Sequence, residues 1–227
     1  LLNPFLLVSS MKRRVILIGL LICGGIFVFW FVVSSARSLP TSAANGLTDF
    51  RGTGGAITQT VKILAPDGEA MDQFGAALAL DGARLAVGAT DDDDRGFSSG
   101  SVYLFERNPI SDTWQVITKL VPLDGMPLAY FGSSIALEGG TLAAGAPGDD
   151  AEKGAVYLYE QDGNGNWLFA HKLTALDAEA GDNYGNAVAL SGDTLAVGAR
   201  NDDDQGFEAG AVYLYERDLG GAGNWGF

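Results

Sequence analysis

Cysteine and histidine are almost absent from this sequence of 227 residues, which contains one of each, Cys23 and His171. A single cysteine cannot form a disulfide within the chain, so we expect no disulfide framework. Cys23 lies in an uncharged apolar stretch, which leaves the rest of the chain without a thiol nucleophile. His171 stands beside Lys172 and has no counterpart in similar segments, so a surface residue is a better interpretation than a general base. We therefore predict that the chain is not an enzyme.

Basic residues are also scarce. The chain has 14 lysines and arginines against 28 acidic residues, and residues 58–227 hold nine basic and 27 acidic residues, a net charge of −18. The phosphate backbone of a nucleic acid requires the opposite sign, which excludes nucleic acid as a partner. The glycines lie at hairpins and strand ends rather than in a strand-to-helix phosphate loop, so no nucleotide cofactor is expected.

One apolar segment is present three times: GSVYLFER at 100–107, GAVYLYEQ at 154–161 and GAVYLYER at 210–217. Its central residues are all apolar or aromatic, so a strand formed by them presents apolar side chains on both faces. Leaving one such face in water would forgo about 1.5–3 kcal/mol for each large side chain. The segment therefore predicts strands covered on both sides by stacked sheets.

A second set of landmarks precedes each copy. The pairs Phe74-Gly75, Phe131-Gly132 and Tyr184-Gly185 are each followed 14 positions later by a Gly-Ala pair, and successive copies start 57 and 53 residues apart. A period near 50 with several short strand-like runs is typical of propeller blades. We predict four strands in each unit, the first two joined by a tight hairpin such as Asp81-Gly82 and the fourth starting at Trp114 or Trp167.

These residues resemble the FG-GAP repeats of integrin α-chains and of many bacterial surface proteins: an FG pair, a GA pair completed to GAP by Pro147, and then GAVYLY. The resemblance implies an all-β fold, with β-propeller blades of four antiparallel strands. It covers residues 62–227 as three units at 62–118, 119–171 and 172–227, the last one truncated. The calcium loop of the integrin propeller does not carry over, because the turns between the first two strands, for example Asp81-Gly82-Ala83, are too short.

The N-terminal part has a different character. Residues 15–36 carry no charge, and 22 residues span about 33 Å as a helix, enough for a hydrocarbon core of about 30 Å. We predict one hydrophobic helix that enters a membrane, with residues 11–36 forming either a signal peptide or a transmembrane anchor. The basic residues 12–14 place the remainder on the extracellular side in both cases. We interpret residues 1–10 as a gene-start artefact and residues 37–57 as a flexible linker.

Both ends of the repeat region suggest an incomplete ring. Residues 58–64 match the pattern of a fourth strand, because Lys62-Ile63 corresponds to Lys119-Leu120, and at the other end only two residues follow Trp225. Three blades are fewer than the four to eight that close a propeller. We expect apolar blade faces to be exposed, and either self-association or further blades to cover them.

Acidic pairs recur in the loop after each Gly-Ala pair. Clustered carboxylates are ligands that calcium takes, whereas aspartates in turns commonly bond loop amides and face solvent, and we favour this second interpretation. The candidate calcium ligands are Asp92, Asp93, Asp149, Asp150, Asp202 and Asp203. Another recurring acid, at Asp67, Asp124 and Asp177, is interpreted as a structural turn residue.

Together these features predict an exported or membrane-tethered extracellular module that binds a protein or glycan, or acts in cell adhesion, without catalysis. Two alternatives stay open. The chain would be part of a larger secreted enzyme that hydrolyses glycans with a catalytic part outside this sequence, or it would be a purely structural surface spacer.

Overall fold

The computed structural model describes residues 22–23, 26–27, 61–219 and 223–226. The chain divides into two compact units, Leu1–Thr58 and Gln59–Phe227. In the first unit, β1 (Ile22–Cys23) and β2 (Ile26–Phe27) pair as a short antiparallel ladder. The rest of the hydrophobic helix predicted within residues 11–36, and the linker predicted at 37–57, lie outside the described residues. No helix among the described residues is long and apolar enough to cross a membrane.

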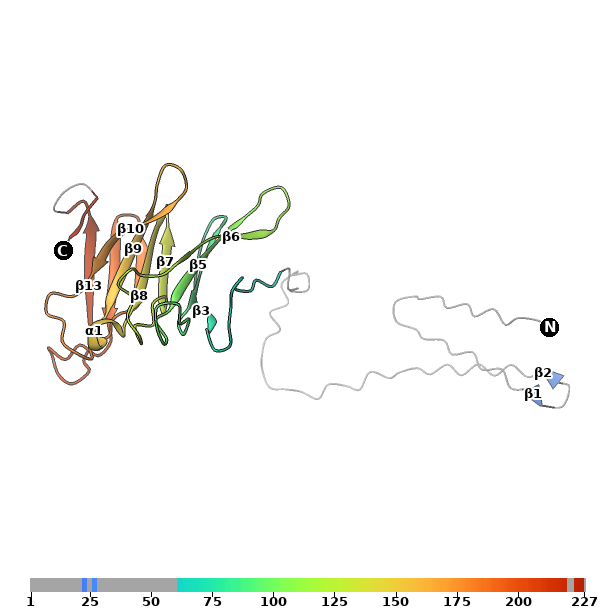
Figure 1. Cartoon of the computed structure of the whole chain (residues 1–227), viewed down its shortest axis with the longest axis horizontal. Coiled ribbons are helices and arrows are strands. Elements are labelled where there is room, and N and C mark those ends of the chain that lie inside the picture. The colour runs from blue at the N-terminus through green and yellow to red at the C-terminus, as the bar shows by residue number, and fades with distance from the viewer. Residues whose placement is uncertain (1–21, 24–25, 28–60, 220–222, 227) are drawn as a thin grey trace, which may run out of the picture. The chain divides into compact units, whose positions relative to one another are not determined.

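The second unit consists of three antiparallel sheets of four strands, which follow one another in chain order (Figure 1). The first sheet contains β3 (Phe74–Asp81), β4 (Arg84–Ala89), β5 (Ser101–Arg107) and β6 (Trp114–Leu120). The second contains β7 (Ser134–Glu138), β8 (Thr141–Ala146), β9 (Ala155–Gln161) and β10 (Trp167–Leu173). The third contains β11 (Tyr184–Ser191), β12 (Thr194–Ala199), β13 (Ala211–Arg217) and β14 (Trp225–Gly226). The predicted all-β fold of four-stranded units is confirmed.

Each repeated apolar segment forms the third strand of its sheet, as its pattern predicts. In the first sheet β5 pairs with β4 on one side and with β6 on the other, so that Val102 lies opposite Gly88 and Leu120. The first five residues of β5 and of β9 are all buried. Apolar side chains on both faces are therefore covered only because a second sheet or segment lies over each face.

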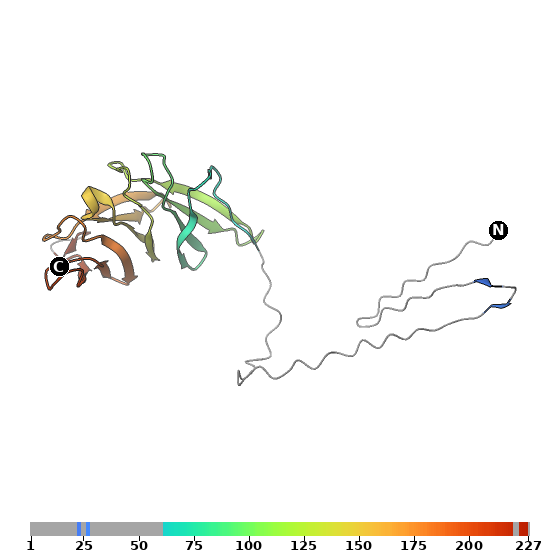
Figure 2. The ribbon, with the colours of Figure 1, turned by 90° about the horizontal axis from the view of Figure 1, so that it is seen from below.

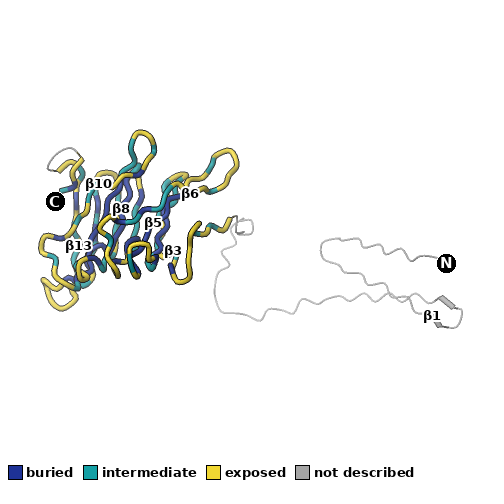
Figure 3. The backbone as a smooth tube through the Cα atoms, in the orientation of Figure 1, coloured by how far each residue is buried: buried dark blue, intermediate teal, exposed yellow. Residues whose placement is uncertain are grey.

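The three sheets stack face against face along an arc (Figure 2). Ala86, Val102 and Leu104 of the first sheet pack with Leu142 and Tyr157 of the second in one apolar core. A second core joins the other face of the second sheet to the third sheet; it includes Val156, Leu158, Leu195, Val197 and Tyr215. The middle sheet is consequently the most buried, and all six residues of β8 are shielded from solvent (Figure 3).

Glycine allows the sheets to approach closely near the ends of their second strands. A Cβ added to Gly88 would lie 2.1 Å from the carbonyl oxygen of Gly132, and one added to Gly145 would lie 1.9 Å from that of Gly185. Such distances leave no room for any side chain. The recurring Gly-Ala landmark thus marks the contact between adjacent sheets.

The outer strand predicted at residues 58–64 is wrong where the structure describes it, because residues 61–64 form no strand. The edge of the first sheet is already formed by β6, so no third strand of that sheet is left for this segment to pair with. Ile63 and Ala65 instead pack on an apolar cluster that contains Val87 and Tyr103. One element was not expected, the four-residue helix α1 (Asp149–Glu152), in which Asp150 and Ala151 have positive φ.

Candidate functional site

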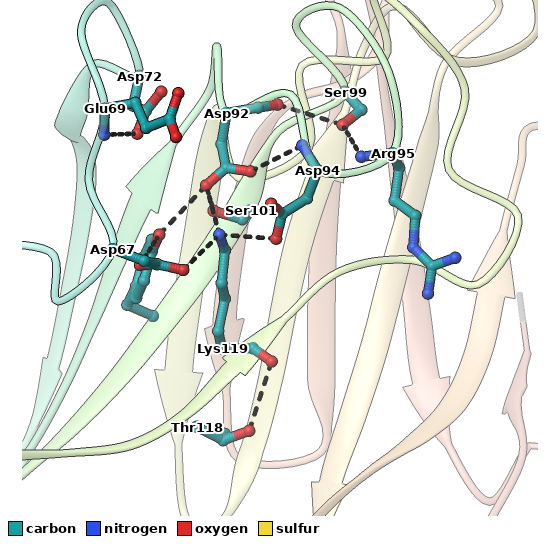
Figure 4. A network of polar contacts seen from close by, with 11 residues as sticks. Asp67, Glu69, Asp72, Asp92, Asp94, Arg95, Ser99, Ser101, Thr118 and Lys119 are labelled. Atoms are coloured by element: carbon teal, nitrogen blue, oxygen red, sulfur yellow. Dashed lines mark hydrogen bonds and ion pairs between the residues drawn. The ribbon is translucent and has the colours of Figure 1, made fainter.

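A polar cluster lies at the start of β5 in the first sheet (Figure 4). Asp92, in the loop after β4, has an exposed fraction of only 3%. Its Oδ2 accepts hydrogen bonds from Ser101 Oγ at 2.9 Å and from the Tyr103 hydroxyl at 3.1 Å, and it lies 2.7 Å from Lys119 Nζ. Lys119 Nζ also lies 3.0 Å from Asp67 Oδ2 and 2.8 Å from a carboxylate oxygen of Asp94. One ammonium therefore joins the segment before β3, the loop after β4 and strand β6.

The second sheet repeats this arrangement. Asp149 is buried, accepts a hydrogen bond from the Tyr157 hydroxyl at 2.5 Å and lies 2.9 Å from Lys172 Nζ. Lys172 Nζ also lies 2.8 Å from Asp124, and the Tyr157 hydroxyl lies 3.0 Å from Asp124, which is thus a second acceptor within reach of its one proton. The other oxygen of Asp149, Oδ1, has no hydrogen-bond partner among the described atoms. In the first sheet the corresponding oxygen of Asp92 accepts a hydrogen bond from the Asp94 amide, but in the second sheet α1 takes the place of that loop.

The third sheet has the carboxylates and the tyrosine of the cluster. The Tyr213 hydroxyl lies 2.9 Å from both Asp202 and Asp177. Repulsion from Asp202, and to a smaller degree from other aspartates, raises the pKa of Asp204.

Each tyrosine is held by the aromatic residue of the repeated Phe/Tyr-Gly pair. The rings of Phe74 and Tyr103 meet edge to face with centroids 5.3 Å apart, and Phe131 meets Tyr157 in the same way at 5.4 Å. Edge-to-face pairs of this kind are favourable beyond the area they bury. The repeated aromatic pair therefore fixes the hydroxyl that the two acidic positions share.

The charges of the first cluster stabilise one another. Burial opposes ionisation of Asp92, yet hydrogen bonds from Lys119, from the Asp94 amide and from Ser101 together lower its pKa. Burial also opposes the charge on Lys119, but its bonds to Asp92 and Asp94 raise its pKa. Burial raises the pKa of Tyr103. All three shifts lead away from neutral pH, whereas general acid–base catalysis requires a pKa near the working pH. The cluster instead anchors the loop after β4 to strands β5 and β6.

The six predicted calcium ligands separate into two groups. The first aspartate of each pair is buried and bonded to tyrosine, and the second is exposed; the buried ones are Asp92, Asp149 and Asp202 and the exposed ones are Asp93, Asp150 and Asp203. Within 61–219 and 223–226, the structure places no group of three or more His, Cys, Asp or Glu residues to hold a metal ion. Calcium binding at these loops stays a prediction.

Sequence reasoning missed that the turn acids and the fourth-strand lysines belong to this site. Asp67 is 52 residues from Lys119, and Asp124 is 48 residues from Lys172. The signal was available, because the acid recurs seven residues before each landmark aromatic and the lysine recurs five residues after Trp114 and after Trp167. Only the stacked sheet geometry shows that both positions meet the same tyrosine.

A groove of about 530 Å³ opens beside this cluster, between loops of the first sheet and loops of the second sheet. Its lining combines aromatic and polar side chains from the loops of both sheets: Gln73, Asp91, Phe97, Ser98, Tyr130 and Ser133. Phe97 has an exposed fraction of 72% and Tyr130 of 37%. The backbone amide of Tyr130 donates to the carbonyl of Ser98 at 3.1 Å, which fixes the two loops against each other. This groove is a concave surface with exposed aromatic groups on a rigid support.

Comparison with known families gives three matches to one family profile, described as FG-GAP repeat, over residues 57–105, 114–159 and 167–215. The matches cover more than half of the chain. The second and third matches begin at the first residue of β6 and of β10, the fourth strands of the first and second sheets, and all three matches end within a third strand.

Two solved structures are similar to this chain, Sqt1 from Saccharomyces cerevisiae and the periplasmic gluconolactonase PpgL from Pseudomonas aeruginosa. Each is 14% identical and superposes with a TM-score of 0.41. The alignments cover 66% and 63% of this chain, and the chain spans only 33% and 39% of those two proteins. Similarity at this level assigns no function.

Proposed function

Because the chain belongs to the FG-GAP repeat family, we propose that its three sheets act as a β-propeller module that binds an extracellular protein or glycan without catalysis. The proposal rests on the groove between the loops of the first and second sheets. Phe97 and Tyr130 are exposed there beside Ser98 and Asp91, so the groove offers apolar ring faces together with hydrogen-bonding groups. Aromatic residues with nearby polar groups dominate the energetics of many binding surfaces.

We propose that the module is not catalytic because of the chemistry of the polar cluster beside the groove. Lys119 and Asp92 have pKa values displaced from neutrality toward their charged forms, so neither exchanges a proton readily at pH 7. The clusters also recur from unit to unit, as expected of residues that stabilise a repeat, whereas a single active site draws on unique residues.

Binding is tested with the full chain on a panel of immobilised glycans and on cell-surface proteins. We expect specific binding that Phe97→Ala and Tyr130→Ala each weaken by about tenfold or more, the usual effect of truncating a central aromatic residue. Ile110→Ala is the matched control, since Ile110 is 96% exposed in the β5–β6 turn at the opposite end of the strands. Equal binding by all three variants would contradict binding of the ligand in the groove, and hydrolysis of a bound glycan would contradict the non-catalytic role.

We propose an extracellular location on the grounds of the N-terminal sequence alone. The uncharged residues 15–36 follow the basic residues 12–14, an order that retains the basic side in the cytoplasm. Protease added to intact cells should then remove the repeat region, leaving a small membrane stub if residues 15–36 remain as an anchor. A repeat region that stays protected until the cells are lysed would refute this location.

A further inference from the structure

A pocket of about 330 Å³ opens on the second sheet, beside its strands β9 and β10 (Figure 1). Its walls come from these two strands and from the segment that joins β6 to β7, and its lining consists of Val121, Leu123, Asp124, Tyr159 and Phe169. None of these residues lines the groove of the proposed function. Pockets for small molecules have volumes of about 300–1,000 Å³, so this one has the size for a small ligand.

Two aromatic rings form one corner of this pocket. Tyr159 and Phe169 lie opposite each other on β9 and β10, with ring centroids 6.0 Å apart and an angle of 75° between the ring planes. A third ring placed in this corner can stack on one of them and meet the other edge to face, and both arrangements are favourable. Val121 and Leu123 add aliphatic contacts. The corner therefore favours an aromatic ligand.

Asp124, the charged residue of the lining, already has its partners. One of its carboxylate oxygens lies 3.0 Å from the Tyr157 hydroxyl, and the other lies 2.8 Å from Lys172 Nζ. A charged ligand would have to give up its hydration without gaining a free counter-ion in the pocket, which is unfavourable. The lining therefore favours a neutral ligand.

Tyr159 brings a hydrogen-bond donor to the wall of the pocket. Its exposed fraction is only 5%, yet its hydroxyl has no hydrogen-bond partner among the residues that the structure describes. Burial, together with the negative charge of Asp124, raises the pKa of Tyr159, so the hydroxyl keeps its proton at neutral pH. A buried donor without an acceptor is unfavourable, and a ligand that supplies an acceptor removes this penalty.

The other two sheets show why this hydroxyl has no partner. In the third sheet Tyr215 occupies the position of Tyr159, and its hydroxyl accepts a hydrogen bond from the Tyr184 hydroxyl at 2.7 Å. The second sheet has Phe131 at the position of Tyr184, and a phenylalanine ring offers no hydroxyl to Tyr159. The first sheet has phenylalanine at both positions. The unpartnered hydroxyl is therefore particular to the second sheet, unlike the polar clusters that recur from sheet to sheet.

We propose that this pocket binds a small neutral aromatic molecule that carries a hydrogen-bond acceptor, such as an aromatic ketone. The ring of the ligand lies against Tyr159 and Phe169, and its acceptor takes the hydrogen bond of the Tyr159 hydroxyl. This site goes beyond the proposed function, because it takes a small molecule and is separate from the groove that binds a protein or glycan.

Acetophenone, an aromatic ring with one carbonyl acceptor, is the probe. It is titrated into the full chain by calorimetry in the same detergent solution for every variant, so that partition of the probe into detergent is common to all samples. We expect saturable binding to the wild type that Tyr159→Phe weakens about fivefold, the usual effect of losing one hydrogen bond. Toluene, which lacks the acceptor, should bind the wild type and Tyr159→Phe equally.

Two further measurements examine the aromatic corner. Phe169→Val should weaken acetophenone and toluene alike by about fivefold or more, because one of the two rings is lost. Cyclohexyl methyl ketone, which keeps the carbonyl but has no aromatic ring, should bind the wild type more weakly than acetophenone does.

Both substitutions are compatible with the fold, since the first sheet has Phe105 and Val116 at the corresponding positions. Tyr159→Phe breaks no hydrogen bond and should leave the melting temperature unchanged. Phe97→Ala, in the groove, is the control and should not alter acetophenone binding. The proposal is overturned if acetophenone does not bind saturably, if its affinity is unchanged in both pocket variants, or if cyclohexyl methyl ketone binds as tightly.

Discussion

The Lys119 ammonium lies 2.7 Å from the carboxylate of Asp92, and the same relationship recurs between Lys172 and Asp149 at 2.9 Å. In both sheets the aspartate is buried and the lysine is partly exposed. Burial of an aspartate in a loop would be unfavourable without such a partner. The pair therefore allows the loop after the second strand to fold against its own sheet. In this position the loop also supports the contact with the next sheet.

Replacing Lys119 with methionine should destabilise the protein by about 2–4 kcal/mol, because the buried Asp92 would lose its compensating charge. The free energy of unfolding from urea titrations measures this effect. Lys153→Met is the matched control, since Lys153 lies 3.7 Å from Asp150 and both side chains are well exposed; we expect a change below about 0.5 kcal/mol. Equal effects of the two substitutions would contradict the structural role of the cluster.

Stability should fall in acid. The pKa values of Asp92 and Asp124 are lowered in the folded protein relative to an ordinary value of 3.8. A carboxyl group with a lowered folded pKa contributes stability that is fully present above its unfolded pKa and is lost as the pH falls through its folded pKa. Urea titrations at pH 7, 5, 4 and 3 should therefore show a loss concentrated below about pH 4.

The Lys119→Met variant should respond to acid differently. Its Asp92 keeps the burial that raises the pKa and loses the ammonium that lowers it, so its pKa should be higher than in the wild type, and protonation as the pH falls should recover part of the lost stability. Parallel pH profiles for the variant and the wild type would show that Lys119 does not set the ionisation of Asp92.

Close approach of the sheets predicts that Gly145→Ala is poorly tolerated. The added Cβ would lie 1.9 Å from the Gly185 carbonyl and 2.3 Å from Ser134 Oγ, so the second and third sheets must separate. We expect a loss of about 1–3 kcal/mol, typical of overpacking. Gly163→Ala, where no atom lies within 4 Å of the added Cβ, should change the free energy of unfolding by less than about 1 kcal/mol. A mild effect at Gly145 would mean that the interface yields easily.

The strands could be predicted from sequence because their signals are local. The apolar segments, the hairpin at Asp81-Gly82 and the 14-residue spacing each act within one sheet, and each is found where the sequence indicates. The polar cluster depends on distant partners, since Asp67 and Lys119 come together only through the sheet between them. Residues 61–64 failed as a predicted strand for a related reason. Their pattern describes the pairing they are suited to, but no third strand with a free edge lies beside them.

The last prediction concerns calcium at the acidic loops. The oxygens of Asp92 and Asp149 already accept bonds from tyrosine and lie beside a lysine ammonium, which repels a cation, while calcium requires six to eight oxygen ligands. A bound ion at a hundredfold excess over Kd would stabilise the fold by about 2.7 kcal/mol and raise the melting temperature visibly. We expect no increase that is specific to calcium. Millimolar calcium, magnesium, and sodium chloride of matched ionic strength should instead raise the melting temperature by the same amount, because each screens the repulsion between carboxylates. A rise specific to calcium that disappears in a variant carrying Asp93→Asn, Asp150→Asn and Asp203→Asn would instead establish the exposed aspartates as ligands.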